Sequence, residues 1–323
     1  MPARVSIVIP SWNGKALLGA CLASLMSQSW RDFEVIVVDD GSTDGTGEFV
    51  RQAYPEVRVV RLPYNSGFCI ATNAGIRASE GSLVFLLNND MTLAPDCLER
   101  LVVSLATTGA GMTGPLILWR DDPESIYSAG DRLRPSGRPE NIGYRMPLAS
   151  FALPRQVFGV SAGAMLARRE LFDEIGLLDE RFGSYFEDCD LCFRARLAGY
   201  AIALAPEARA YHVGSASLQG NRWKRARQCC RNHALLVVKN MPARLLLRHF
   251  PSIARERLHQ AACVVSSARC EFGLLRAVGM LGKTMGSMAR ALPYALRERR
   301  RIQRARRVTA ADIESLLTRE PSA

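Results

Sequence analysis

Short apolar runs alternate with amphipathic stretches through the first half of the chain. The runs of valine, isoleucine and leucine have the length of buried strands, and the stretches between them carry apolar residues at helical spacing. The strands that we expect are 5–9, 35–38, 57–62 and 83–87, and the helices are 15–29, 46–53 and 68–78. Strands that alternate with helices of about ten residues indicate βαβ units and a parallel sheet that is buried on both faces.

The pattern weakens at residue 119 and changes again at residue 218. Residues 119–157 are rich in proline, glycine and charge, so we expect long loops there. Three elements are expected next, namely a strand at 161–167, a helix from Arg169 and a helix from about Glu187 to Gly199. Beyond residue 218, apolar residues recur at helical spacing, and we expect helix breaks at Pro242, Pro251 and Pro293. We therefore divide the chain into a domain at 1–218 and a helical extension at 219–323.

The composition is that of an ordinary globular protein. Of the 323 residues, 48% are hydrophobic and 23% are charged, which argues against wholesale disorder, collagen and a coiled coil. No apolar run approaches the ~18 residues of a transmembrane helix. The opening residues lead straight into a strand-like run whose apolar core is too short for a signal peptide. We therefore expect a cytoplasmic protein with reduced cysteines.

The charge is distributed unevenly along the chain. Residues 1–218 hold 20 lysines and arginines against 25 acidic residues, a net charge of −5, whereas residues 219–323 hold 22 against 6, a net charge of +16. A basic helical segment suits a polyanionic surface, either an anionic membrane or a nucleic acid. Aromatic residues on which bases could stack are sparse in it, so we expect an anionic membrane surface and no nucleic acid. A solvated bundle or a homodimer interface through the C-terminal helices is the alternative.

Polar residues follow three of the expected strands, at the end where parallel sheets bind their ligands. Residues 10–13 follow the first strand, residues 39–44 the second and residues 88–90 the fourth. Neither of the glycine-rich loops that cradle phosphates is present. A carboxylate that holds Mg²⁺ or Mn²⁺ against diphosphate oxygens is another way to bind a nucleotide, and Asp90 is the candidate.

Five segments, in order along the chain, resemble the family 2 glycosyltransferases and most closely their bacterial rhamnosyltransferase-like branch. They are VSIVIPSWNG (5–14), VIVVDDGSTDGT (35–46), NSGFCIATNAGI (65–76), FLLNND (85–90) and SAGAMLARRELFDEIGLLDERFGSYFEDCDLCFRARLAGY (161–200). The resemblance extends over about residues 3–215. It implies the α/β GT-A fold, a Rossmann-like, mostly parallel nucleotide-sugar-binding sheet with helices on both faces, followed here by the C-terminal helical extension. Residues 1–118 would form the nucleotide-binding half and residues 119–218 the acceptor-side half.

The resemblance implies a nucleotide-sugar site at the strand ends. The residues that it assigns to this site are Pro10, Trp12, Asn13, Asp40, Gly67, Asn73 and Asn89. Among them, Asp40 matches the second aspartate of the DDGS element, which contacts the nucleoside in the family. The D-x-D metal motif of the family is Asn-Asn-Asp at 88–90 here, which leaves Asp90 as the one carboxylate in the motif to hold Mg²⁺ or Mn²⁺.

The resemblance also implies a second cluster, in the segment EDCD at 187–190. The family uses the aspartate of its Glu-Asp pair as a general base, which is Asp188 here, and Glu187 and Gly163 would lie on the acceptor side. A helix that begins at Glu187 should keep Asp188 ionised, because the positive end of the helix dipole favours an anion. His212, in the segment YHVGS, would contact the metal or the diphosphate. An ordinary acidic first helical turn and a structural histidine are the alternatives.

The resemblance predicts an inverting glycosyltransferase at the inner face of the plasma membrane. It would move a sugar, rhamnose by first choice, from dTDP-rhamnose or a UDP-sugar to a hydroxyl of a glycan or lipid-linked acceptor in cell-surface polysaccharide synthesis. The alternative is a nucleotide-sugar-binding scaffold or regulatory protein of the same fold. Asn88, in place of the family's aspartate, favours the scaffold, whereas Asp188 and His212 favour the enzyme because a binding module needs no base.

Overall fold

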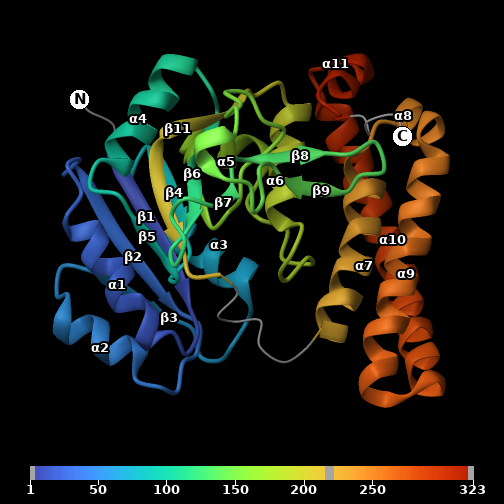
Figure 1. Cartoon of the computed structure of the whole chain (residues 1–323), viewed down its shortest axis with the longest axis horizontal. Coiled ribbons are helices and arrows are strands. Elements are labelled where there is room, and N and C mark those ends of the chain that lie inside the picture. The colour runs from blue at the N-terminus through green and yellow to red at the C-terminus, as the bar shows by residue number, and fades with distance from the viewer. Residues whose placement is uncertain (1–3, 215–221, 319–323) are drawn as a thin grey trace.

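A nine-stranded sheet lies beside a bundle of C-terminal helices in the computed structural model, which describes residues 4–214 and 222–318 (Figure 1). The strands of this sheet are β1 (Val5–Ser11), β2 (Phe33–Asp39), β3 (Arg58–Arg61), β4 (Leu83–Leu87), β5 (Met91–Leu93), β6 (Met112–Trp119), β7 (Ile126–Ser128), β10 (Ala164–Arg168) and β11 (Ile202–His212). A separate two-stranded hairpin is formed by β8 (Asp131–Leu133) and β9 (Pro139–Asn141).

The helices fall into two groups along the chain. Those between the strands are α1 (Lys15–Met26), α2 (Thr46–Ala53), α3 (Phe68–Ala78), α4 (Cys97–Thr108), the 3-10 helix η1 (Leu148–Ser150), α5 (Arg169–Ile175) and α6 (Glu187–Leu197). Those after the last strand are α7 (Arg222–Asn240), α8 (Ala243–Arg248), α9 (Phe250–Phe272), α10 (Leu274–Ala305) and α11 (Ala310–Ser315). α2, α3 and β4 have the limits that the apolar pattern predicts.

The sheet order is β3-β2-β1-β4-β10-β6-β11-β5, with β7 paired to β6. The strands from β3 to β4 are parallel, as predicted, and β6 is parallel to β11. β10 lies between β4 and β6 and is antiparallel to both. The sheet is therefore mixed beyond β4, which apolar runs alone do not reveal because strand direction depends on the connections.

Side chains of the central strands alternate between two hydrophobic clusters, one on each face of the sheet. Val5, Ile7 and Ile9 of β1 pack with leucines of α1 and α4. Val8 points the other way and packs in the cluster that contains side chains of α3, α5 and α6. This alternation follows from the two-residue repeat of a strand, and it confirms that helices cover both faces.

Two details of this part differ from the expectations. Pro10 lies inside β1, which continues to Ser11, and the pairing of β1 with β4 ends earlier, at Val8. Residues 119–157, expected to be loops, contain β7, β8, β9 and η1, each only three residues long. Strands this short carry too few residues for an alternating pattern to be read from the sequence.

The C-terminal helices differ from the expectation at one of the three prolines. Pro242 separates α7 from α8 as predicted. A second break falls at His249, between α8 and α9, and Pro251 lies in the first turn of α9, where a missing N–H costs nothing. Pro293 does not break α10, because packing of α10 against α7 and α9 holds it. The break instead falls at Gly273, whose φ of +79° suits glycine.

The C-terminal helices share the hydrophobic core of the sheet. Leu235 and Leu236 of α7 and Ile302 of α10 belong to the same buried cluster as side chains of α3, α5 and α6. Leu317, after α11, forms a β-bridge with Leu133 of β8. No helix in the described parts of the chain is long and apolar enough to cross a membrane. The division of the chain into a domain at 1–218 and an extension at 219–323 stays a prediction.

Candidate active site

The carboxyl ends of β1, β2 and β4 meet at one edge of the sheet, because these strands are parallel neighbours. There, Asn13 adopts a left-handed conformation with φ +48°. Its side-chain oxygen accepts a hydrogen bond from the Thr43 N–H at 2.8 Å, and its own N–H donates to Ser42 Oγ at 2.9 Å. These bonds tie the loop after β1 to the loop after β2, and they leave the neighbouring Trp12 side chain 54% exposed.

The Asp40 carboxylate is buried and organises the start of α3. Its two oxygens accept hydrogen bonds from the backbone N–H groups of Ser66, at 2.7 Å, and Gly67, at 2.9 Å. Gly67 has φ +93°, a conformation that other residues adopt only with strain. This hydrogen bond joins Asp40 to Gly67. Both residues lie at the edge of the sheet where we predict the nucleotide-sugar site.

The side chain of Asn89 lies close to the backbone of Gly14. Its Nδ2 donates to Ser11 Oγ at 2.9 Å. A Cβ atom at Gly14 would lie 2.2 Å from Asn89 Nδ2 and 2.5 Å from Ser11 Oγ, so only glycine leaves room for this hydrogen bond. The bond connects the segment after β4 to the end of β1.

Asn73 lies in α3 and is buried. Its Nδ2 donates to the carbonyl of Leu178 and to Glu180 Oε1, both at 2.9 Å, and its Oδ1 accepts from the Leu178 N–H at 3.1 Å. These bonds attach the loop at 178–180 to α3. A contact between Asn73 and a nucleotide stays a prediction, since the observed partners of the amide are all in this loop.

Asp90 and His212 come together because β11 pairs with β5 in antiparallel register, with His212 opposite Met91. Asp90 Oδ2 and His212 Nε2 are 3.1 Å apart, and the two side chains are 11% and 10% exposed. The other oxygen of the carboxylate, Asp90 Oδ1, is buried without a hydrogen-bond partner among the described residues, as is His212 Nδ1. A buried carboxylate oxygen without a partner is costly, and a bound cation would satisfy it.

The chemistry of this pair fits a divalent cation with open coordination positions. Carboxylate oxygen and imidazole nitrogen are ligands for Mn²⁺, and Mg²⁺ needs only one or two carboxylates when phosphate oxygens complete its shell. Within residues 4–214 and 222–318, no group of three or more His, Cys, Asp or Glu side chains could hold a metal ion. Any cation here would therefore take its other ligands from a substrate or from water.

Glu187 and Asp188 open α6 directly after a strained turn. Tyr185 and Phe186 have φ values of +65° and +72°, in the region that residues other than glycine rarely occupy. Asp188 Oδ1 accepts from the Cys189 N–H at 2.7 Å, and the carboxylate also interacts with the Ser161 hydroxyl. Asp188 is half-buried, whereas Glu187 is buried and its Oε2 has no hydrogen-bond partner.

The turn at 161–163 joins the two sides of the site. Because β10 is antiparallel to β4, with Ala164 opposite Leu87, this turn lies at the carboxyl end of β4. The Asn88 N–H donates to the carbonyl of Gly163 at 2.9 Å, and a Cβ at Gly163 would lie 3.1 Å from Asn88 Nδ2. One end of the turn therefore contacts Asp188 and the other end contacts the segment that carries Asp90.

Desolvation dominates the electrostatics of the acidic cluster. Burial raises the pKa of Asp188 although hydrogen bonds to the carboxylate lower it. Burial and the charge of Asp188 raise the pKa of Glu187 well above its usual range. Desolvation therefore outweighs the hydrogen bonds at Asp188, and its ionisation at neutral pH stays a prediction.

Sequence comparison decides which family this site belongs to. The model of the family described as "Glycosyl transferase family 2" matches residues 6–176, which is more than half of the chain. The chain belongs to glycosyl transferase family 2. The match covers the strand ends at β1, β2 and β4 and stops before Glu187, Asp188 and His212.

Curated relatives of this family 2 chain cover different shares of it. The N-acetylglucosaminyl-diphospho-decaprenol L-rhamnosyltransferase of Mycobacterium tuberculosis is 31% identical over 219 residues, which are 59% of this chain and 70% of that protein. An uncharacterized protein of Sinorhizobium fredii, y4gI, is 32% identical over 232 residues, 66% of this chain. The present chain spans only 25% of the length of that second relative.

Solved structures share the fold at low sequence identity. A mannosyltransferase from Pyrobaculum calidifontis, solved with GDP-Man and Mn²⁺, aligns with a TM-score of 0.59 and 20% identity over 94% of this chain and 86% of that one. GalNAc-T7, solved with UDP, GalNAc and Mn²⁺, aligns with a TM-score of 0.62 and 18% identity over 80% of this chain and 51% of that one. The fold is therefore GT-A, with a C-terminal helical region.

Asp131 of β8 is a site residue that the sequence analysis missed. Its backbone carbonyl accepts from the N–H of Phe158, at 2.9 Å, which holds β8 beside the strand that leads to Ser161. Burial and the charge of Asp188 raise the pKa of Asp131. A lone aspartate in an irregular region carries no sequence signal, since only the fold brings it near Asp188.

An aromatic group beside His212 was also missed. The Tyr127 ring lies edge-on to the His212 ring, with centroids 4.4 Å apart, and to the Trp119 ring, at 4.9 Å. Tyr144 lies 5.8 Å from Trp119, and the Arg145 guanidinium lies 5.1 Å from the centroid of the Trp119 ring. The signal in the sequence is the concentration of aromatic residues in 119–144, a segment that was expected to be loops.

α7 supports the acidic cluster from the C-terminal side. The buried Asn232 Nδ2 lies within hydrogen-bond distance of the carbonyls of Phe182, Ser184 and Tyr185, at 2.9, 2.9 and 2.8 Å. These carbonyls belong to the strained turn that precedes Asp188. The sequence gives little indication of this role. A single asparagine in a helix that is otherwise rich in arginine and leucine is expected to be a surface residue.

A buried ionic group continues this contact along α6 and α7. Asp190 binds Arg194 and Lys239, both at 2.8 Å, and accepts from Asn240 Nδ2 at 2.8 Å. Burial would raise the pKa of Asp190, but the charges of Lys239 and Arg194 reverse this effect and lower it to about 2. Asp190 is therefore ionised and structural.

Replacing Asp131 by Asn tests the coupling between Asp131 and Asp188. Burial and the charge of Asp188 raise the pKa of Asp131 to about 8, so Asp131 carries no charge over the acidic limb of the pH profile of kcat/KM. Asparagine reproduces this uncharged form, so Asp131→Asn should keep the acidic limb and lose the change in kcat/KM that ionisation of Asp131 causes near pH 8. The exposed Asp173 on α5 provides the matched control, Asp173→Asn, which should leave the whole profile in place. A change near pH 8 that persists in Asp131→Asn would contradict the coupling.

Replacing Asn232 by Ala tests whether α7 positions the turn that carries Asp188. The turn loses its hydrogen-bond donor, so kcat should fall about 10- to 100-fold while the KM for the donor stays nearly constant, because a misplaced reactive group affects the chemical step. Lys224→Ala, at an exposed position on the same helix, should change neither value. Equal losses in donor binding and kcat, together with a lower melting temperature, would indicate a role in stability alone.

Proposed function

We propose that this chain is an inverting glycosyltransferase that moves a sugar from a nucleoside-diphosphate sugar to a hydroxyl of a glycan or lipid-linked acceptor. The observation that carries the proposal is the connection of Asp90 and Asp188 through the turn at 161–163. One carboxylate lies beside His212 on the nucleotide side, and the other lies at the head of α6. A site with two such sides can act on a leaving group and on an attacking group at the same time.

The nucleotide would lie across the carboxyl ends of β1, β2 and β4. The indole of Trp12 is exposed there, and Asp40 with Gly67 forms a rigid corner next to it. Pro10, Asn13 and Asn89 shape the same edge. Asp90 and His212 would hold Mg²⁺ or Mn²⁺, which would offset the negative charge that builds up on the departing diphosphate. Both structural neighbours described above were solved with Mn²⁺.

Asp188 would act as the general base. It takes the proton from the acceptor hydroxyl while that oxygen attacks the anomeric carbon, and the bond from this carbon to the diphosphate oxygen breaks with its electron pair. The configuration at the anomeric carbon inverts because attack and departure occur on opposite faces. The raised pKa of Asp188 supports this role, because a carboxylate with a higher proton affinity is a stronger base.

The acceptor side would be formed by Glu187, Gly163 and the aromatic group around Tyr127. Aromatic rings are suitable surfaces for sugar rings, and these lie directly beside His212. For the donor we propose dTDP-rhamnose first and UDP-sugars second. The support is the name of the mycobacterial relative, a rhamnosyltransferase whose named acceptor is N-acetylglucosaminyl-diphospho-decaprenol. The same name supports a lipid-linked acceptor, and we propose that the product serves cell-surface polysaccharide synthesis.

We propose further that the chain works as a peripheral protein on the inner, cytoplasmic face of the plasma membrane. The net charge of +16 over residues 219–323 supports attraction to anionic lipids. Nucleic acid is not part of the proposal, because this segment offers few aromatic side chains for stacking. A homodimer through the C-terminal helices is the alternative use of the same surface.

A nucleotide-sugar-binding scaffold without turnover is the second candidate function. The observation that favours it is Asn88, which replaces a carboxylate of the family's metal motif and leaves the donor set incomplete. A scaffold would have no use for the arrangement of Asp188, Asp131 and Asn232. The enzyme is therefore the better supported of the two.

Donor turnover in Asp188→Asn tests the proposed function. Release of nucleoside diphosphate from dTDP-, UDP- and GDP-sugars is measured with Mn²⁺, Mg²⁺ or EDTA, with a membrane extract as acceptor. We expect metal-dependent release by the wild type and a loss of about 100- to 10,000-fold in Asp188→Asn, with donor affinity by calorimetry unchanged. Asp173→Asn, an exposed carboxylate on α5, serves as the matched control.

Each other outcome has a definite meaning. Full turnover in Asp188→Asn would refute its role as the base. A wild-type protein that binds a donor but releases no diphosphate with any acceptor would support the scaffold. Absence of binding to every nucleotide sugar would refute the nucleotide site itself.

A further inference from the structure

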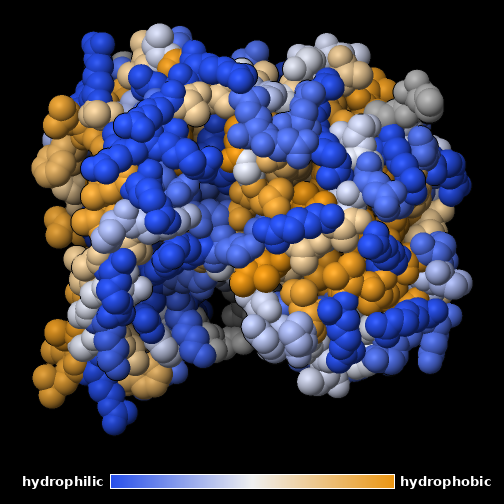
Figure 2. Space-filling model, turned by 180° about the vertical axis from the view of Figure 1, so that it is seen from behind, coloured by the Kyte–Doolittle hydropathy of each residue, from blue (hydrophilic) through white to orange (hydrophobic). Residues whose placement is uncertain are grey.

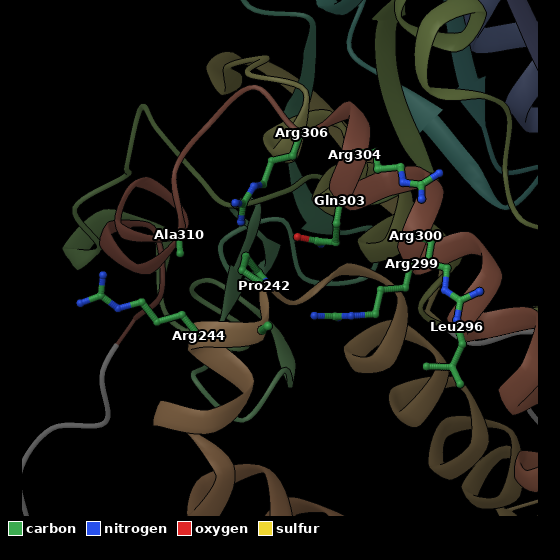
Figure 3. Close-up of a pocket in the computed structure, with 10 residues that line it drawn as sticks. Pro242, Arg244, Leu296, Arg299, Arg300, Gln303, Arg304, Arg306 and Ala310 are labelled. Carbon is green, nitrogen blue, oxygen red and sulfur yellow. The ribbon is translucent and has the colours of Figure 1, made fainter.

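A cavity of about 710 Å³ lies where α8, the C-terminal part of α10 and the start of α11 meet (Figure 3). Its lining residues are Pro242, Ala243, Arg244, Leu296, Arg299, Arg300, Gln303, Arg304, Arg306 and Ala310. Five of these ten residues are arginines, and none is acidic. The cavity is formed by the C-terminal helices and is distinct from the site at the strand ends.

Within residues 4–214 and 222–318, no acidic side chain forms an ion pair with an arginine of the cavity. The ion pairs at this end of the molecule use other arginines: Glu298 binds Arg297 and Arg301, and Glu314 binds Arg248. Burial and the charge of Arg306 lower the pKa of Arg299. Like charges that repel one another around one cavity favour binding of an anion there.

Part of the cavity is held rigid before any ligand binds. Arg299 Nη1 donates to the carbonyls of Val238, at 2.9 Å, and Met241, at 2.6 Å, and Gln303 Nε2 donates to the carbonyl of Asn240 at 2.7 Å. These bonds anchor α10 to the end of α7. Since a guanidinium has five N–H donors, Arg299 keeps others for a ligand. Arg299 and Arg306 point toward the space beside Gln303, whereas the Arg244 side chain extends from α8 away from them, along the edge of the cavity (Figure 3).

Apolar side chains are exposed around the arginines. Leu296 lines the cavity and is 43% exposed, Leu292 one turn earlier on α10 is 45% exposed, and Leu247 one turn after Ala243 on α8 is 81% exposed. Figure 2 shows hydrophobic groups among hydrophilic ones along the outer edge of the helical bundle. A free phosphate ion would gain nothing from these leucines, whereas a lipid offers both an anionic headgroup and an apolar chain.

We propose that this cavity binds the phosphate group of an anionic phospholipid. Arg299 and Arg306 would donate hydrogen bonds to the phosphate oxygens, because guanidinium matches their geometry, and Arg244 would add its positive charge at the edge of the cavity. Leu247 and Leu296 would enter the interface beside the headgroup. The inference deepens the proposed membrane attachment by replacing a diffuse basic surface with one site, and it does not depend on the transferase chemistry.

Vesicle binding by two matched double variants tests this site. Arg244→Gln with Arg306→Gln removes two cavity charges, and Arg276→Gln with Arg290→Gln removes two exposed charges from α10 away from the cavity. Binding to vesicles of phosphatidylglycerol and phosphatidylcholine is compared with binding to phosphatidylcholine alone. We expect the cavity variant to bind the anionic vesicles about 30-fold more weakly and the control at most about 3-fold more weakly, since charges near the headgroups contribute most.

The remaining arms separate the other interpretations. Equal losses in the two variants would overturn the proposal in favour of a diffuse basic surface, and a wild type that ignores anionic vesicles would overturn it outright. Binding of inorganic phosphate is measured by calorimetry. If the cavity variant loses phosphate binding but keeps its affinity for anionic vesicles, the ligand of the cavity is a soluble anion and the lipid proposal is overturned. Donor binding and melting temperature should be unchanged in both variants. If the double variant fails to fold, the single variant at the exposed Arg244 carries the same test.

Discussion

The antiparallel insertion of β10 beside β4 is the constraint on which the site depends. It carries the turn at 161–163 to the carboxyl end of β4, where the carbonyl of Gly163 accepts a hydrogen bond from the Asn88 N–H. In a fully parallel sheet, only segments that follow a strand lie at this edge. Because β10 is antiparallel, the segment that precedes it lies here as well. The insertion therefore brings a segment from the second half of the chain within contact of the metal motif of the first half.

The acidic cluster needs support from the opposite side, and α7 supplies it. A turn with two successive residues at positive φ is unfavourable and persists only where its surroundings hold it. Asn232 donates to the carbonyls of this turn. Further along α7, Lys239 neutralises the buried Asp190, and Asn240 donates a hydrogen bond to the same carboxylate. The C-terminal helices are thus part of the framework around Asp188 as well as the most basic region of the chain. These two roles coexist because α7 faces the sheet domain, whereas the arginines that line the cavity lie at the junction of α8, α10 and α11.

The parts that the sequence could predict are those with local signals. Buried strands such as β4 and helices such as α3 have continuous apolar or periodic patterns, and residues at strand ends such as Asp40 and Asp90 are placed by the direction of parallel strands. The family resemblance supplied Asp188 and His212, whose roles as base and metal ligand stay predictions. Asp131, Tyr127 and Asn232 could not be found in this way, because each acts through a neighbour far away in sequence. The rise in the pKa of Asp188 could not be predicted for the same reason, since it depends on burial by the folded chain.

The central claim is that one carboxylate acts on the acceptor in a single displacement while the nucleotide leaves from the other side of the same crevice. The stereochemistry of the product tests this claim most directly. The anomeric configuration of the newly formed glycosidic bond is determined by NMR spectroscopy and compared with that of the donor that the enzyme uses. The account predicts inversion, because Asp188 activates the acceptor opposite the departing diphosphate. Retention of configuration would contradict it, since retention is incompatible with one direct displacement.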